Sequence, residues 1–395
     1  MIDALRRAPL LVIAASASFS MSTLFSSVKP VLLTQFVAET GVTRSMAGWF
    51  VAMPFIGIAL ATFVVAALLA RFSYTRLVNA AGAILVASQL LLSVTFEVPF
   101  LTLLLQLVSG AAVGILMGVT SYHIARTPSP GVLFGIVDTI GVLLMSVMVA
   151  GVGIAATLLG VAGGFLFSAA LCTLFWLLMY VYAGEQVVSR CQNDAQRDSP
   201  MLRPVIIIVM GVLFVTFSGQ GFAFMFSIAN QLGMSMERAG AQIGIVLFVS
   251  AFACLAGGVA CARFGPERPL LCAFIICAVS WTVAIHAQSP TVFLAALLPA
   301  ISMLQFSFPI LLAFAGTLDT DGKWAAVATP LFTSGFAWAA VLAGVIVESR
   351  DIATLAFSTQ AGMFLCALLL GASVLTRPTE DLVASAGDAD EPLKE

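Results

Sequence analysis

Charged residues are scarce in this 395-residue chain. Asp, Glu, Lys and Arg make up only 9% of it, whereas an average soluble domain contains about a quarter. The formal net charge of -2 is too small to indicate a polyanionic partner, and we expect no nucleic acid. Hydrophobic residues account for 61% and form continuous runs, and a helix that crosses a bilayer needs roughly 20 apolar residues. The composition therefore predicts an integral membrane protein.

Histidines and metal-ligand patterns are also scarce. The two histidines, His123 and His286, are far apart, and no metal-ligand spacing, nucleotide-binding loop or nucleophile motif accompanies them. Six of the seven cysteines fall within apolar runs, where a thiol usually packs as a small hydrophobe. We therefore expect no enzyme activity, no catalytic residue, no cofactor, no metal and no disulfide.

The apolar runs predict an all-α integral membrane fold with twelve transmembrane helices. Short polar or turn-forming connections such as Glu97-Val98-Pro99 and Ser289-Pro290 separate them. A signal peptide is not expected, because the first apolar run is longer than the 7–15 residues of such a segment. The predicted spans are 10–35, 45–70, 76–96, 99–122, 131–157, 161–183, 204–230, 239–262, 269–287, 290–316, 324–347 and 352–375.

Two longer polar segments divide the chain. Residues 184–203 contain six charged side chains and predict a cytoplasmic linker, and residues 376–395 form an acidic tail that we expect to be disordered. The predicted organisation is a six-helix bundle over 1–183, the linker, a second six-helix bundle over 204–375, and the tail.

The basic residues indicate the orientation of the spans. With the N-terminus in the cytoplasm, thirteen of the 17 Lys and Arg residues fall on the cytoplasmic side and three on the other. Cytoplasmic loops of membrane proteins hold an excess of Lys and Arg, and a wrong number of spans would scramble the pattern. The distribution therefore favours a multi-pass protein of the cell membrane with both termini cytoplasmic.

An internal repeat relates the two halves. The Gly41-Val42-Thr43 segment recurs at Gly233, and Ala70-Arg71-Phe72 with Arg76 recurs at Ala262 with Arg268; both copies are 192 residues later. Arginines are rare in this apolar sequence, so their recurrence at one spacing indicates a true repeat. The repeat predicts two bundles related by a pseudo-two-fold axis, with a solute site between halves that rock against each other.

These repeated segments resemble the major facilitator superfamily over the whole chain. Its loop between helices two and three reads roughly G-x-L-a-D-R-x-G-R, and the copies here run from Ala66 and from Gly258. Alanines, Ala70 and Ala262, replace the family's aspartate, so an aspartate-dependent gate latch is not expected. The resemblance implies gating roles for Arg71, Arg76, Arg263 and Arg268, while topology alone would also explain these arginines.

Helices four and five depart from the family pattern. Gln106 stands where the family's R-x-x-x-G motif has arginine, although Gly110 matches, and helix five lacks the G-P pair of many drug antiporters. The resemblance places helices one, four, seven and ten around the central cavity. Polar and aromatic residues on these helices are the predicted substrate-binding set: Ser22, Ser26, Lys29, Gln106, Gln220, Phe222, Phe226 and Gln305.

Ionisable residues inside membrane spans are costly, so each is a candidate functional residue. Lys29 shares one helical stripe with Ser22 and Ser26, which suits a cavity wall, although a lysine near a helix end can also reach the headgroups. Asp138 is about seven residues into helix five. It is predicted to brace the cytoplasmic gate, and it is also the obvious proton carrier.

The expected function is secondary transport of a small organic solute by alternating access. An unpaired ammonium in a low-dielectric cavity favours an anionic ligand, so Lys29 favours a small organic anion. A carrier that exports drugs or lipophilic compounds is a second reading, and a channel is a third. The expected partners are a small-molecule substrate, membrane lipid and, for a coupled carrier, an ion; the expected state is a monomer.

Overall fold

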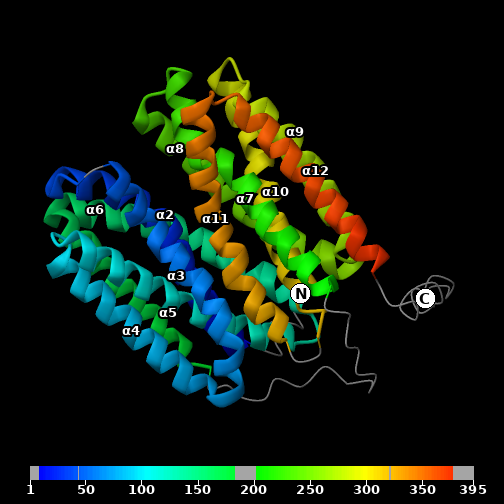
Figure 1. The fold of residues 1–395 in the computed structure, drawn as a ribbon, viewed down its shortest axis with the longest axis horizontal. Coiled ribbons are helices and arrows are strands. Elements are labelled where there is room, and N and C mark those ends of the chain that lie inside the picture. Colours follow the sequence, from blue (N-terminus) through cyan, green and yellow to red (C-terminus); the bar gives the residue numbers. More distant parts are fainter. Residues whose placement is uncertain (1–8, 43, 183–201, 320–321, 377–395) are drawn as a thin grey trace.

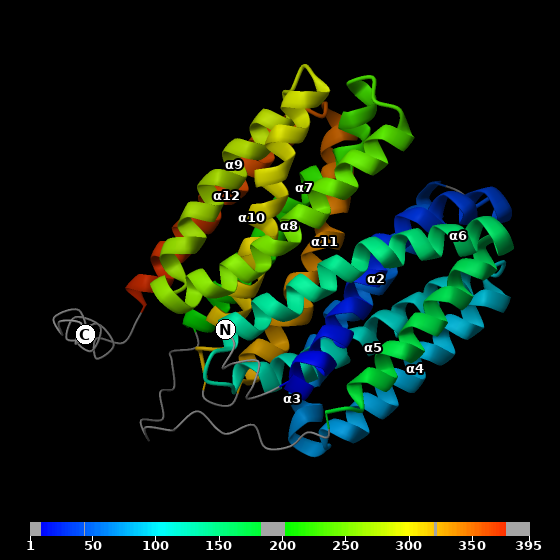
Figure 2. The same ribbon diagram turned by 180° about the vertical axis from the view of Figure 1, so that it is seen from behind.

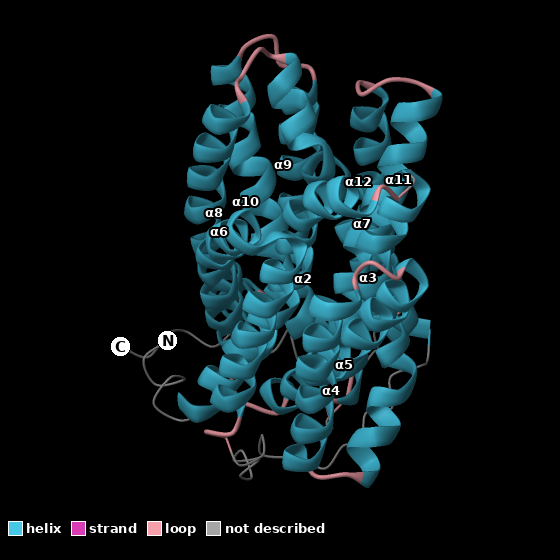
Figure 3. Ribbon diagram, turned by 90° about the vertical axis from the view of Figure 1, so that its left-hand side faces the viewer, coloured by secondary structure: helices cyan, strands magenta, loops and turns pink. Residues whose placement is uncertain are grey.

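The computed structural model describes residues 9–42, 44–182, 202–319 and 322–376. Figure 3 shows that helices make up this part of the chain. The described helices, in order, are α2 (Pro9–Thr40), α3 (Arg44–Arg71), α4 (Tyr74–Thr95), α5 (Pro99–Ala125), α6 (Pro130–Met179), α7 (Leu202–Gln231), α8 (Met236–Phe264), α9 (Glu267–Ile285), α10 (Pro290–Ala315), α11 (Lys323–Ser349) and α12 (Thr354–Leu375).

The eleven helices contain twelve spans, because α6 is two helices joined at a kink. Its backbone is non-helical at Leu159 and Gly160, and Gly160 has φ 66°, a conformation that glycine adopts readily. The prediction of twelve transmembrane helices is confirmed. In the described residues, ten helices are long and apolar enough to cross a membrane, and Pro9–Phe25 and Pro130–Met145 are shorter apolar segments within α2 and α6.

The first described helix, α2, caps the turn inside α6. The Glu39 carboxylate, near the end of α2, accepts hydrogen bonds from the backbone N–H of Val161 at 3.0 and 3.3 Å. A helix begins with unpaired N–H groups, which an acidic side chain satisfies well. Here a carboxylate on another helix therefore accepts the hydrogen bond of a backbone N–H group at the start of the sixth span.

Proline and glycine mark the ends of many helices. Pro99, Pro130 and Pro290 occupy the first turn of their helices, where a missing N–H costs nothing. Gly41 and Gly233 follow the C-terminal ends of α2 and α7 and have φ 63° and 77°. These two glycines are equivalent in the sequence repeat, so the repeat appears as the same left-handed helix end in both halves.

The helices form two bundles, α2–α6 and α7–α12 (Figures 1 and 2). The first half packs on the second through two interfaces, α3 and α5 with α11, and α6 with α8 and α10. When the helices are numbered as twelve spans, the second span (α3) contacts the eleventh (α11), and the fifth span (the first part of α6) contacts the eighth (α8). A six-helix shift exchanges these two contacts, as a pseudo-two-fold axis requires.

The predicted polar segments mostly lie outside the described residues. This applies to 184–201 of the linker and to all of the tail after residue 376. The end of the predicted linker is helical, because α7 begins at Leu202 and includes Arg203, whose side chain is buried.

Candidate functional site

The interface between α6 and α8 is built from glycines. A Cβ atom on Gly258 would overlap the carbonyl oxygen of Gly131, and one on Gly135 would lie 2.7 Å from the carbonyl oxygen of Cys254. Real Cβ atoms do not approach backbone that closely, so the two helices touch backbone to backbone. Small residues permit this approach between membrane helices.

The second interface is similarly tight at the same end of the molecule. A Cβ atom on Gly118 of α5 would lie 2.9 Å from the carbonyl oxygen of Ala326 on α11. One on Gly322, which precedes α11, would lie 2.9 Å from the carbonyl oxygen of Tyr122 on α5. We call the end of the molecule that contains these contacts and the loops 126–129 and 316–319 the closed end.

The opposite end lacks such contacts at the equivalent helices. At Gly153 of α6, Gly240 and Gly244 of α8, and Gly344 of α11, a Cβ atom would have no described atom within 4 Å. The ribbons of the two bundles diverge toward this end in both views (Figures 1 and 2). Among the described residues, the halves are therefore held together at the closed end.

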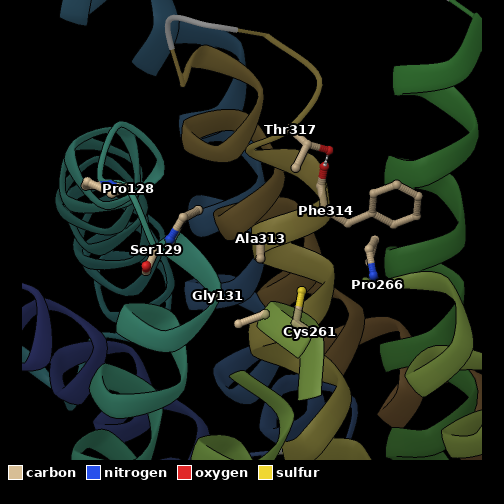
Figure 4. A pocket seen from close by; sticks show the side chains of 10 residues that line it. Pro128, Ser129, Gly131, Cys261, Pro266, Ala313, Phe314 and Thr317 are labelled. Atoms are coloured by element: carbon tan, nitrogen blue, oxygen red, sulfur yellow. Dashed lines mark hydrogen bonds between the residues drawn. The ribbon is translucent and has the colours of Figure 1, made fainter. Parts of the chain in front are cut away.

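A cavity of about 250 Å³ lies at the closed end, where both halves meet (Figure 4). Ser129 and Gly131 come from the start of α6, Cys261 from the end of α8, and Ala313 and Thr317 from the end of α10 and the loop after it. A separate apolar groove of about 490 Å³ is lined by residues of α3, α4 and α5, including Leu68 and Ile84. Neither space contains a predicted substrate-binding residue.

Two predicted residues from opposite halves come together near the closed end. Asp138 is three residues after Gly135, on the face of α6 that packs on α8, and its carboxyl group lies near the Cys254 thiol. That thiol donates a 3.8 Å hydrogen bond to Oε1 of Gln305 on α10. Asp138 was predicted to brace the gate and Gln305 to bind substrate. Cys254, which connects them, was read from the sequence only as a small hydrophobe.

The other predicted substrate residues are spread over several environments. Gln106 is fully buried one turn before Gly110, which packs on Pro54 of α3. Gln220 is fully buried between Gly219, which packs on α11, and Gly221, which packs on α9. The side-chain nitrogen and oxygen of both glutamines have no hydrogen-bond partner in the described part of the chain. Buried amide groups without a protein hydrogen-bond partner are suited to bind an exchangeable ligand or a water molecule.

The aromatic and serine candidates differ in exposure. Phe222 packs 6.3 Å from the ring of Phe336 on α11, whereas Phe226 is 37% exposed. Ser22 is buried on α2. One turn earlier on its stripe, Ser18 accepts a 3.3 Å hydrogen bond from Thr120, so Ser18 faces α5. The side chains of Ser26 and Lys29 lie outside the described residues, although their backbone belongs to α2.

The four predicted gate arginines are exposed. Arg71 ends α3 and Arg263 is in the last turn of α8, so the two copies of the motif occupy equivalent helix ends. Arg76 and Arg268 are in the first turns of the following helices, α4 and α9. Within the described ranges none of the four forms an ion pair, and the closed end is held by glycine contacts.

An aromatic cluster at the closed end was not anticipated from sequence. Three of the four tyrosines surround His123, and Tyr182 Oη lies 3.1 Å from its Nδ1. Arg126 donates a 3.0 Å hydrogen bond to Tyr122 Oη. Since Tyr122 also contacts Gly322 of the second half through its backbone, the cluster borders the gate. Tyrosine is rare in the chain, and this rarity is the sequence feature that could have indicated a special role for these residues.

The Major Facilitator Superfamily sequence model matches residues 10–342. The chain belongs to this superfamily and is a multi-pass membrane protein that carries out secondary transport of a small molecule. No curated protein matches the sequence.

Solved structures of this superfamily share the fold at low sequence identity. The FucP transporter in the outward conformation matches with TM-score 0.72 and 14% identity, over 92% of this chain and 98% of that one. The proton:xylose symporter XylE gives 0.74 and 14%, over 92% and 95%. The human organic anion transporter MFSD10 gives 0.70 and 12%, over 93% and 99%. At these identities the likeness defines the fold alone.

Proposed function

We propose that this protein is an alternating-access carrier for a small organic anion. The contacts between its halves support a rocking mechanism: they are concentrated at one end and are related by the pseudo-two-fold axis. Releasing this end while the opposite end closes would expose a central site to each side in turn.

We further propose that the closed end faces the cytoplasm. The excess of Lys and Arg falls on the side of the loops 126–129 and 316–322, with the linker and both termini. The described conformation is then outward-facing, the conformation named for the FucP crystal structure.

The preference for an anion rests on Lys29 of α2. Ser18, on the stripe predicted to contain Lys29, faces α5, because it accepts a hydrogen bond from Thr120. Glu39, the next acidic residue along α2, is ten residues on, or about 15 Å of helical rise, and its carboxylate is already bonded to the backbone of Val161. A lysine ammonium inside a span needs a counter-charge, and a substrate carboxylate can supply it.

The structural neighbours do not decide between substrate classes. They include a fucose:proton symporter, a proton:xylose symporter and an organic anion transporter, so one fold serves neutral sugars and organic anions. The charge on helix one is therefore the observation that favours an anion here.

Uptake into proteoliposomes tests the proposal. Radiolabelled mono- and dicarboxylates should enter saturably, Lys29→Gln should abolish the uptake, and Lys29→Arg should keep part of it. Arg350→Gln is the matched control, because this exposed basic residue follows α11 on the predicted outer side. Undiminished uptake by Lys29→Gln would reject the anion preference and favour a neutral or lipophilic solute, and flux that does not saturate would indicate a channel.

A further inference from the structure

An apolar groove opens on the outside of the first half, between α3 and α4. Both helices pack on α5 but scarcely contact each other, so α5 is the floor of the groove and α3 and α4 are its walls. Its volume is about 490 Å³, which is within the range of small-molecule sites, about 300–1,000 Å³. Four alanines line it, and their short side chains leave this space open: Ala80 and Ala81 of α4, and Ala111 and Ala112 of α5.

The groove is open to the bilayer. The helix that forms one of its walls, α4, lies on the side of the first half that faces away from the second half (Figures 1 and 2). Phe72 and Ile84, which line the groove, are 44% and 47% exposed. Apolar side chains on the outer surface of a membrane-spanning bundle contact lipid, so the natural occupant of this space is part of a lipid molecule.

Arg76 is the only charged residue among the described residues that line the groove. It is in the first turn of α4, at the closed end, and its side chain is exposed. From Arg76 to Ile84 the groove follows α4 for eight residues, or about 12 Å of helical rise. An apolar channel therefore leads from a guanidinium group at the end of the spans toward the middle of the bilayer.

No carboxylate of the described first half shares this surface with Arg76. Glu97 follows the other end of α4, Glu39 caps the turn inside α6, and Asp138 is on the face of α6 that packs on α8. Arg71, at the end of α3, adds a second exposed positive charge at the same end. The surface at the mouth of the groove is therefore positive and attracts an external anion.

The sequence repeat offers a contrast within the molecule. Arg268 is the equivalent of Arg76 in the second half, and it is likewise exposed in the first turn of its helix, α9. Glu267 precedes it in that turn, whereas Thr75 precedes Arg76. A neighbouring carboxylate lowers the local positive potential, so Arg268 is expected to attract an anion less strongly than Arg76.

We propose that the groove binds one anionic phospholipid from the leaflet at the closed end, with its phosphate on Arg76 and one acyl chain between α3 and α4. A guanidinium group donates paired hydrogen bonds to a phosphate, and burial of the chain removes apolar surface from competing contacts. In a zwitterionic lipid, the cation of the headgroup would lie close to two arginines, which favours a lipid with net negative charge.

Two simpler interpretations account for only part of this arrangement. Membrane topology alone would place an arginine at this end of α4, but it would not produce an apolar channel that begins at the arginine. An apolar groove alone would accept any acyl chain, but it would not select a headgroup. The proposal goes beyond transport and does not depend on the identity of the solute.

Native mass spectrometry of the full-length protein tests the proposal. The protein is purified in detergent, freed of lipid, and mixed with phosphatidylglycerol or phosphatidylcholine that carry identical acyl chains. We expect one phosphatidylglycerol molecule to be retained at concentrations at which phosphatidylcholine is not. Inorganic phosphate should not displace it, because the acyl chain is held as well as the phosphate.

Two pairs of substitutions separate the charge from the groove. Arg76→Gln should weaken phosphatidylglycerol binding roughly tenfold, because hydrogen bonds to charged groups are strong, whereas Arg268→Gln should bind like the parent. Ala80→Leu fills the groove and should weaken binding although every charge is kept. Ala83→Leu is its matched control, because Ala83 is an exposed alanine of α4 that is not part of the groove lining.

Several results would overturn the proposal. Equal retention of the two lipids by the parent, or equal losses for Arg76→Gln and Arg268→Gln, would show that no selective site is present. Displacement by inorganic phosphate, or an unchanged affinity of Ala80→Leu, would indicate a site for soluble anions in place of a lipid site.

A further variant applies if Arg76→Gln does not fold. Arg76→Lys keeps the charge but cannot form the paired hydrogen bonds, so it should bind phosphatidylglycerol more weakly than the parent does. Binding equal to that of the parent in both Arg76→Lys and Ala80→Leu would overturn the proposal. Lipid retention is measured without solute, so its failure is distinguishable from a failure of the proposed carrier function.

Discussion

The two ends of the boundary between the halves are built from the same kinds of residue but pack differently. At the closed end, Gly131, Gly135 and Gly258 bring α6 and α8 into backbone contact, whereas Gly240 and Gly244 at the other end of α8 have no described neighbour within 4 Å of a Cβ position. Glycine is therefore a structural necessity at one end and not at the other. In an alternating-access carrier, glycines at the separated end would permit the reciprocal contact.

The largest effect that tests this comparison is expected at Gly258. In Gly258→Ala the new methyl group overlaps the Gly131 carbonyl oxygen, and overpacking of this kind costs about 1–3 kcal/mol. The closed:open ratio should fall roughly tenfold or more, measured from the distance between spin labels on cysteines introduced at the exposed positions Thr75 and Thr317, one on each half at the closed end. Gly244→Ala is the matched control on the same helix. Equal effects of the two alanines would remove the difference between the ends.

A smaller effect is expected at Gly322, where conformation and contact can be separated. Gly322 has φ 76° and Gly233 has φ 77°, so alanine should pay a similar left-handed penalty of about 1–2 kcal/mol at both. Only at Gly322 does the methyl group also meet another helix, at the Tyr122 carbonyl oxygen. Thermal unfolding in detergent should therefore show a larger loss for Gly322→Ala, and a loss no greater than that of Gly233→Ala would contradict the contact.

The turn inside α6 should show a modest effect. Glu39→Gln weakens the cap on the Val161 N–H, and loss of a helix cap typically costs about 1 kcal/mol. The melting temperature should fall by a few degrees or less, because the effect per kcal/mol decreases with size. Glu97→Gln, at an exposed position between α4 and α5, should leave the melting temperature unchanged; a matching decrease there would mean that surface charge, and not the cap, is responsible.

The smallest effect concerns Asp351, in the loop that joins α11 and α12. Hydrogen bonds from the hydroxyl and backbone N–H of Thr354 lower the pKa of this carboxyl group below its usual 3.8. A lowered pKa means that the stabilisation is present above the unfolded-state value and is lost as pH falls through the folded-state value. Asp351→Ala should therefore be slightly less stable than the parent at neutral pH, with the difference shrinking on acidification below pH 3.8. A difference that grows on acidification would have the wrong sign.

Sequence reasoning predicted the span count and the repeat because bilayer thickness and loop charge constrain them directly. The arginines of the repeat, Arg71 and Arg263, could be assigned to equivalent helix ends without coordinates. Helix rotation could not be assigned in the same way. A membrane helix is apolar on the sides that face lipid and on those that face protein, so hydrophobic periodicity indicates no direction.

Gln106 and Cys254 illustrate this limit. Gln106 was predicted to line the cavity from its position on helix four; in the structure it is fully buried one turn before Gly110, which packs on α3, and its contact with a substrate stays a prediction. Cys254 seemed unremarkable as an apolar thiol, yet it is beside Asp138 because Gly135 brings α6 against its backbone. Tertiary contacts between distant segments of the chain decide both cases.

The cap that Glu39 supplies to Val161 has a consequence for biosynthesis. The acceptor belongs to α2, the first described helix, and the donor to the sixth span, 122 residues later. The amide at the start of the sixth span therefore has no such partner until that span has been inserted beside the first. This contact between the first described helix and the last helix of the first half can therefore form only after all of the spans between them have been synthesised.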